Sequence, residues 1–165
     1  MDHAERKRKV NLDFNSIQPQ FKWVQFTGQG TPDATYVFVL NRSIPRLSGS
    51  SDILYVGETD DPIASRYQQE TSTNNTKANT QATNIRLTHV FGKLGLSPNV
   101  TCHFTTQRTV QLTPNDPFLQ DLMIWAKTNW RIVAQGSTPV VSLEKYLLVK
   151  YAVYHWELPP LNNSF

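Results

Sequence analysis

The sequence predicts an α/β (α+β) domain in which helices flank a small mixed β-sheet. Two segments, 34–41 and 52–57, are rich in apolar residues and have the length of strands. The second leads into a helix signal, because Asp61 is placed to cap a helix and Pro62 stands at its first position. A chain of 165 residues without an internal repeat or linker has the length of one domain.

The start of the chain is charged and then polar, and we interpret residues 1–20 as an arm before a domain of residues 21–165. Four of the sixteen positive charges stand together at residues 6–9, either as a solvated tail or as an arm that contacts phosphates. The formal net charge of +3 is compatible with a polyanionic partner. Residues 21–26 alternate weakly and are expected to form an edge strand.

In the first of the two central strands, Tyr36 alternates onto one face with Phe38. The link over residues 42–51 is too long for a tight hairpin turn, so we expect a surface loop there. Its two arginines, Arg42 and Arg46, are candidates for contacts with backbone phosphates, and plain solvation is the alternative.

The rest of the chain alternates between helix and strand signals after a polar loop over 71–83. Apolar spacing and turn residues predict a helix over 84–94, a strand over 99–105, a helix over 117–128 and a short strand over 130–135. A long final helix is expected through Tyr154, with Thr138 as its cap and Pro139 at its first position. Its apolar face would consist of Leu143, Leu147, Tyr151 and Tyr154.

A set of short motifs gives these elements a family resemblance. Ala34-Thr35-Tyr36 and Tyr55-Val56-Gly57, followed by Arg66 nine positions after Gly57, resemble the core of the GIY-YIG nucleases. Glu144 on a helix and then Pro159-Pro160-Leu161-Asn162 are similar to the closing pattern of that family. The resemblance implies a GIY-YIG-like single domain with an insertion, about 71–135, between the arginine helix and the glutamate helix.

The resemblance also implies hydrolysis of a phosphodiester bond with one divalent metal ion, Mg²⁺, for which Mn²⁺ can substitute. Glu144 would be the metal ligand, and a single carboxylate with several waters suits Mg²⁺. Tyr36 would help to activate the water, while Tyr55 would support it and contact the phosphate. Arg66 offers a planar fork that suits a phosphate with developing negative charge.

Each of these residues also has an ordinary structural interpretation. Glu144 could pair with Lys145 or Lys150 on the surface, the two tyrosines could be core packing, and Arg66 could be a helix-surface charge. Gly57 and Asn162 are expected to give structural support, with Asn163 as the alternative to Asn162.

Many GIY-YIG members carry a histidine, tyrosine or lysine soon after the arginine. In this chain, His89 and Lys77 are the candidates for that catalytic partner, and a structural histidine is the alternative for His89. Lys77 and Arg86 join Arg42 and Arg46 as expected DNA contacts.

The leading functional hypothesis is a metal-dependent DNA endonuclease that acts sequence-specifically on duplex DNA, as restriction enzymes do. A homodimer would let one active site per subunit cut both strands. The alternatives are a structure-specific repair or recombination nuclease, a non-catalytic nucleic-acid-binding domain, and a structural or host-interaction protein with accidental motif matches.

The compartment is predicted from what the sequence contains. Its single cysteine, Cys102, excludes an internal disulfide and favours a reducing compartment without a disulfide-linked partner. No apolar run approaches the roughly 20 residues that span a bilayer, and no signal peptide opens the chain. We therefore expect a soluble cytoplasmic protein without a membrane partner.

Overall fold

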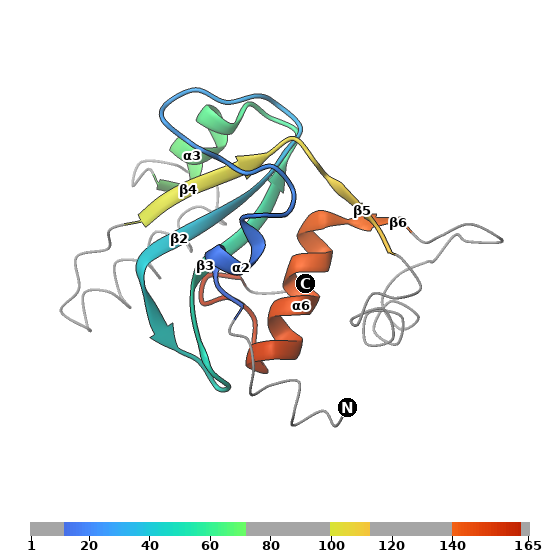
Figure 1. The fold of residues 1–165 in the computed structure, drawn as a ribbon. Helices are drawn as coiled ribbons and strands as arrows, with labels where there is room; N and C mark the ends of the chain where they lie inside the picture. Colours follow the sequence, from blue (N-terminus) through green and yellow to red (C-terminus); the bar gives the residue numbers. More distant parts are fainter. Residues whose placement is uncertain (1–11, 72–99, 113–139, 163–165) are drawn as a thin grey trace.

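A four-stranded antiparallel sheet with the strand order β1-β4-β2-β3 forms the centre of the fold (Figure 1). The structure, a computed structural model, describes residues 12–71, 100–112 and 140–162. The strands are β1 (Val24–Gln25), β2 (Ala34–Pro45), β3 (Ser50–Thr59) and β4 (Val100–Thr105). All three pairings are antiparallel, so the predicted mixed sheet is wrong for the described residues, while the combination of helices with one small sheet is confirmed.

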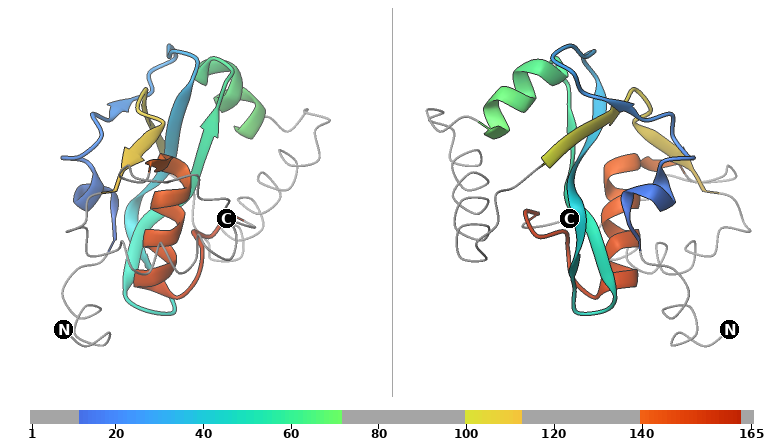
Figure 2. Two further views of the ribbon diagram at one scale, coloured as in Figure 1. Left: turned by 90° about the vertical axis from the view of Figure 1, so that its right-hand side faces the viewer. Right: turned by 60° about the vertical axis from the view of Figure 1, so that its left-hand side comes forward.

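The other described elements surround this sheet. They are the helices α2 (Phe14–Ile17), α3 (Ile63–Thr71) and α6 (Leu143–His155), and a two-stranded sheet of β5 (Thr109–Gln111) and β6 (Val140–Ser142). Helices α3 and α6 lie on opposite sides of the main sheet (Figure 2). Among the described helices, none is long and apolar enough to cross a membrane.

Alternation along the strands gives the sheet two buried faces. On one face, Val37 and Val39 pack in a cluster with Leu147 of α6 and Phe14 of α2. On the other face lies a second cluster, which contains Tyr36, Phe38, Leu40, Ile63 of α3 and Leu161 near the end of the described chain. The predicted alternation of Tyr36 with Phe38 and Leu40 is confirmed, and it places Tyr36 on the α3 side.

The hairpin of β2 and β3 is longer than the sequence predicts. The strands continue to Pro45 and from Ser50, so a four-residue turn over 46–49 replaces the predicted surface loop over 42–51. The amide of Arg46 donates to the carbonyl of Gly49 at 3.0 Å, and Gly49 has a φ of 70°, which glycine adopts without strain. The pairing of Ile44 with Ser51 extends the sheet into the segment whose charged residues suggest a loop.

A β-bulge interrupts β3 close to the motif residues. The register shifts between Phe38, which pairs with Tyr55, and Val39, which pairs with Ile53. Leu54 is therefore the extra residue, and Leu54 and Tyr55 both pack in the cluster on the α3 side. The bulge lets Ile53 keep its place on the opposite face.

The segment 12–17 belongs to the folded domain, which corrects the prediction of an arm up to residue 20. Leu12, Phe14 and Ile17 are buried, with 2%, 6% and 1% of their surface exposed. The amide of Phe14 donates to the Asp52 carboxylate at 2.8 Å, so β3 holds this segment by a hydrogen bond as well as by packing. The basic residues 6–9 lie outside the described residues.

Strand β4 corrects the predicted extent of the insertion. The expected strand over 99–105 is confirmed, but it lies between β1 and β2, and its Cys102 and Phe104 are buried in the α3-side cluster. Residues 100–105 are therefore an interior part of the main sheet and not an addition to it. Of the expected edge strand over 21–26, only Val24 and Gln25 form a strand, β1, which pairs with β4, while Phe21 and Lys22 have positive φ angles of 69° and 52°.

The last helix begins later than predicted. Val140 and Val141 form β6 against β5, and the helix starts at Leu143 with Ser142 as its cap. Val140 and Val141 are β-branched and pair with a neighbouring strand, so they do not join the helix that the cap signal at Thr138 predicts. Thr138, Pro139 and the elements predicted over 71–83, 84–94, 117–128 and 130–135 lie outside the described residues, apart from the helical residue 71.

Candidate active site

Three of the predicted site residues come together on the α3 side of the sheet. The Nε of Arg66 donates to the Tyr36 hydroxyl oxygen at 3.4 Å, which links α3 to β2. The Tyr36 and Tyr55 rings have centroids 5.8 Å apart, on neighbouring strands. Helix α3 begins at Ile63, one residue after the predicted first position at Pro62, so Arg66 lies in its first turn. The structure thus places one arginine and two phenols side by side.

Gly57 explains how two tyrosines fit at this point of the sheet. It lies opposite Tyr36 in the β2–β3 register. A Cβ on Gly57 would lie 2.7 Å from Cζ and from the hydroxyl oxygen of Tyr36, and 2.7 Å from Cε1 of Tyr55. These distances are far below van der Waals contact, so the two rings occupy the space that a side chain would need.

Glu144 lies in the first turn of α6, where a carboxylate faces the positive end of the helix dipole. Burial raises the pKa of Glu144, Lys145 opposes this shift, and the charge of Glu58 raises the pKa further, while Arg108 and Arg66 lower it. The ionised form is therefore unfavourable in these surroundings, and a cation bound beside Glu144 would offset that cost.

The raised pKa predicts that Glu144 reduces stability near neutral pH. The folded protein binds this proton more tightly than the unfolded chain, so the free energy of unfolding falls as the pH rises from the ordinary pKa of 4.5 through the raised pKa. We expect Glu144→Gln to be more stable than the parent at pH 7 and to lose this advantage at pH 4. Urea unfolding in EDTA at both pH values checks this, and a variant that is less stable at pH 7 would contradict it.

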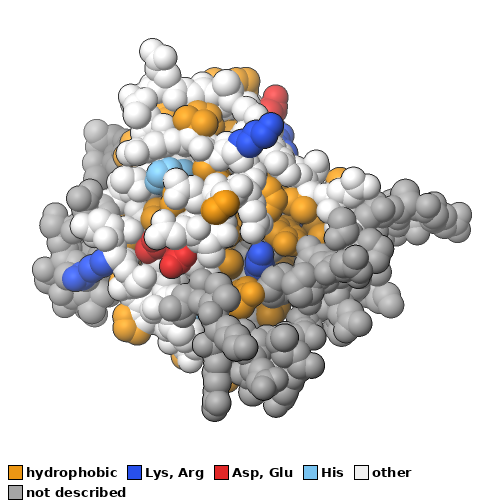
Figure 3. All heavy atoms as spheres, in the orientation of Figure 1, with side chains coloured by type: hydrophobic (Ala, Val, Ile, Leu, Met, Phe, Trp, Pro, Cys, Tyr) orange, Lys and Arg blue, Asp and Glu red, His pale blue; other side chains and the backbone are white. Residues whose placement is uncertain are grey.

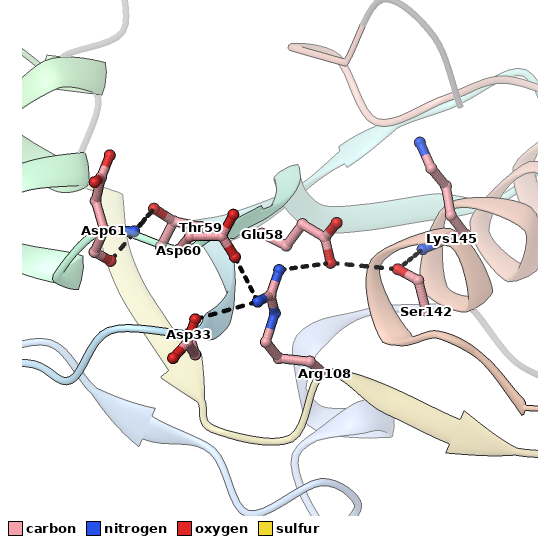
Figure 4. A network of polar contacts seen from close by, with 8 residues as sticks. All are labelled: Asp33, Glu58, Thr59, Asp60, Asp61, Arg108, Ser142 and Lys145. Atoms are coloured by element: carbon pink, nitrogen blue, oxygen red, sulfur yellow. Dashed lines mark hydrogen bonds and ion pairs between the residues drawn. The ribbon is translucent and has the colours of Figure 1, made fainter.

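Arg108 forms a network of ion pairs at the end of β3 (Figure 4). This network was not predicted from the sequence. Its guanidinium forms ion pairs with Asp60 at 2.6 Å, with Asp33 at 3.4 Å and with Glu58 at 3.4 Å. Hydrogen bonding to Asp60 is the main cause that raises the pKa of Arg108. The sequence shows three acidic residues within positions 58–61, and a nearby cation would offset their mutual repulsion. Nothing in the sequence identifies Arg108 as that cation.

Asn162 fastens the end of the described chain to β3. Its side-chain oxygen accepts from the Val56 amide at 3.0 Å and its side-chain nitrogen donates to the Val56 carbonyl at 2.9 Å. The amide of Leu161 donates to the Leu54 carbonyl at 3.0 Å. Asn162 thus has the supporting position expected of it, directly beside the Tyr55–Gly57 motif. Asn163, the alternative, lies outside the described residues.

The arginines of the hairpin lie at different places. Arg42 is exposed on β2, where a phosphate contact remains a prediction. Arg46 pairs with Glu157 through Nε at 3.0 Å and donates to the Leu158 carbonyl at 2.9 Å, and only 11% of its side chain is exposed. Because these contacts join the hairpin turn to the end of α6, a DNA contact by Arg46 would have to compete with them.

The remaining expected contacts cannot be placed. His89, Lys77 and Arg86 lie outside the described residues, so their roles stay predictions. On the described part of the face over α2 and β4, the basic side chains form no large patch, and acidic side chains and uncharged surface lie among them (Figure 3). Residues 12–71, 100–112 and 140–162 contain no group of three or more His, Cys, Asp and Glu side chains that could hold a metal.

The structure therefore brings Arg66, Tyr36 and Tyr55 together on the α3 side of the sheet. Glu144 lies at the start of α6, on the other side, and is linked to Arg66, Glu58 and Arg108 through the effects of their charges. Comparisons of the chain with protein families, with curated proteins and with solved structures return no match.

Proposed function

We propose that the protein is a metal-dependent endonuclease that hydrolyses phosphodiester bonds in DNA by GIY-YIG-type chemistry. The observation that carries this proposal is the hydrogen bond from Arg66 to the Tyr36 hydroxyl, next to Tyr55 and within the electrostatic influence of Glu144. Tyr36, Tyr55 and Arg66 come from two strands and one helix, and Glu144, much further along the chain, stands at the start of a second helix where the charge of Arg66 acts on it.

The contacts of Tyr36 support a role in handling a proton. Its hydroxyl oxygen accepts the Arg66 N–H, and in the proposed reaction the hydroxyl would donate its hydrogen to a water or to a phosphate oxygen. The whole of Tyr36, hydroxyl included, is buried, which fixes the direction of the hydroxyl, and an attacking water would have to enter this buried space. A fixed hydroxyl that is held by a cation is suited to orient the attacking water.

Arg66 would neutralise negative charge on the phosphate, and Glu144 would bind the metal ion. A guanidinium neutralises the phosphate as negative charge develops on its oxygens, and Arg66 is already oriented by Tyr36. Glu144 would hold Mg²⁺, or Mn²⁺ in its place, with water as the other ligands. When bound, the ion supplies Lewis-acid stabilisation of the phosphate and of the leaving oxygen.

The substrate class follows from the family resemblance and from charge. The chain carries a net charge of +3, and the basic residues 6–9 are available for phosphate contacts. We propose duplex DNA as the substrate, cut sequence-specifically in the manner of a restriction enzyme, with a homodimer placing one site on each strand.

The test is cleavage by the purified full-length chain with Mg²⁺ or Mn²⁺, compared with EDTA. We expect cleavage of plasmid or genomic DNA in either metal and none in EDTA, because the phosphate requires charge neutralisation by the ion. Discrete fragments indicate sequence specificity, and a smear or nicking indicates its absence. If plasmid, genomic and branched DNA all stay intact across metals and pH values, the proposal is wrong and a binding domain becomes the better hypothesis.

A further inference from the structure

The four elements that carry the candidate catalytic residues each begin or end at one junction. Strand β2, with Tyr36, begins just after Asp33. Strand β3 ends at the acidic turn that leads into α3 and Arg66. Helix α6, with Glu144, begins beside them at Leu143. The relative positions of Tyr36, Arg66 and Glu144 therefore depend on what holds this junction together.

The guanidinium of Arg108 holds two of these segments. It binds Asp33 before β2, and Glu58 and Asp60 at the end of β3 (Figure 4). Isolated surface ion pairs contribute little to stability, but a planar guanidinium with partners in two segments fixes their relative orientation. The side chains of Arg108 and Glu58 are 29% and 35% exposed, whereas those of Asp33 and Asp60 are 69% and 84% exposed, so only the pair with Glu58 is partly shielded from solvent.

The same residue holds the start of α6. The carbonyl of Arg108 accepts the amide of Leu143 at 2.8 Å, and Leu143 is the neighbour of Glu144. The Ser142 hydroxyl donates to Glu58 at 3.5 Å and accepts the Lys145 amide at 3.4 Å, so the cap of α6 is also connected to the carboxylate that Arg108 pairs with. Arg108 thus reaches the first turn of α6 directly through its backbone and indirectly through Glu58.

We infer that Arg108 is a positioning residue that fixes Glu144 relative to the Tyr36–Arg66 pair. This inference rests on the proposed nuclease function. Arg108 acts through Glu58, Asp60 and the first turn of α6, and it does not touch the substrate. It also explains how α6 is brought to the site although a long stretch of chain separates it from α3.

The experiment compares Arg108→Gln and Arg108→Lys with the parent as full-length proteins. We expect Arg108→Gln to lower the single-turnover cleavage rate by about 10- to 100-fold, the usual effect of losing a residue that orients a metal ligand. The Mg²⁺ concentration for half-maximal rate should rise, and the DNA dissociation constant should stay within about twofold because no phosphate contact is lost. Arg108→Lys should recover part of the rate, since it keeps the charge and loses the fork.

Two controls separate positioning from general destabilisation. Asp52→Ala removes the hydrogen bond to Phe14 at the opposite end of β3, so it should lower the melting temperature without changing the rate. Glu58→Gln should lower the rate as well, and the double variant Glu58→Gln/Arg108→Gln should be little worse than Arg108→Gln alone. If the rate losses of Glu58→Gln and Arg108→Gln are fully additive in the double variant, Arg108 does not act through Glu58.

Amide hydrogen exchange provides a readout that does not depend on cleavage. Arg108→Gln should speed exchange at Leu143 and Lys145, the amides of the first turn of α6, whereas Asp52→Ala should not. Unchanged exchange, or a parental cleavage rate in Arg108→Gln, overturns the inference. Weaker DNA binding with a salt slope reduced by about 0.9 would instead make Arg108 a phosphate contact. A parent protein that cuts no DNA refutes the proposed function, and exchange at the first turn of α6 still decides whether Arg108 holds it.

Discussion

Replacing Glu144 with alanine is expected to reduce the single-turnover cleavage rate by about 10³-fold or more. A bound metal ion supplies several kcal/mol of transition-state stabilisation, and each 1.36 kcal/mol corresponds to a factor of about ten. DNA binding without metal should remain close to that of the parent, because the variant removes a carboxylate and not a phosphate contact. The measurement is the single-turnover rate in Mg²⁺ together with the dissociation constant in EDTA.

Glu157→Gln is the matched control for this variant. Glu157 lies just after α6, where it pairs with Arg46 and accepts the Leu47 amide at 2.8 Å. Its loss should lower the melting temperature and leave the rate unchanged. If Glu144→Ala still cuts in Mg²⁺, the metal lies elsewhere, and Glu58 would be the next carboxylate to test because its charge acts on Glu144.

Gly57→Ala is expected to damage both the fold and the reaction. The new methyl group would lie 2.7 Å from atoms of Tyr36 and Tyr55, so the buried Tyr36 ring has to move. Overpacking of this kind costs about 1–3 kcal/mol, which lowers the melting temperature by about 2–4 °C per kcal/mol in a chain of this size. Displacing a positioned hydroxyl by about 1 Å can cost about 10²-fold in rate.

Tyr36→Phe separates these two effects. It keeps the ring and its packing and removes only the hydroxyl that Arg66 binds, so its stability should change by about 1 kcal/mol or less. Its rate should nevertheless fall by about 10²-fold. Both variants are compared by single-turnover rate and melting temperature. A parental rate in Tyr36→Phe would make Tyr36 a packing residue, and a parental rate in Gly57→Ala would exclude a precise role for either ring.

The sequence predicted correctly those elements whose formation depends on residues close together in the chain. The alternation around Tyr36 and the Asp61-Pro62 cap signal correspond to β2 and to the start of α3. The positions of Tyr36, Tyr55 and Arg66 follow from these elements, so their proximity could be predicted as well. The position of Glu144 could not be predicted, because the start of α6 is bonded to Arg108, which lies between β4 and β5 in the segment predicted as an insertion.

The features that the sequence did not predict have a common cause, because each depends on a contact with a segment that is distant along the chain. Val140 and Val141 have no strand signal of their own, and they form β6 because β5 lies beside them. Leu12 and Phe14 stand among polar residues and are buried because the sheet and α6 cover them. Arg108 belongs to no motif, since its role arises only where three segments meet.

The hydrogen bonds of Asn162 have a consequence for the synthesis of the protein. Strand β3 is the last strand of its sheet, and Leu161 and Asn162 occupy backbone groups of Leu54 and Val56 that would otherwise be open to another chain. Val56 and Asn162 are 106 positions apart, which at about 5–20 residues per second means a delay of roughly 5–20 s on the ribosome. During that interval the edge of β3 is unprotected, so aggregation of the nascent chain competes with folding until Leu161 and Asn162 have been synthesised.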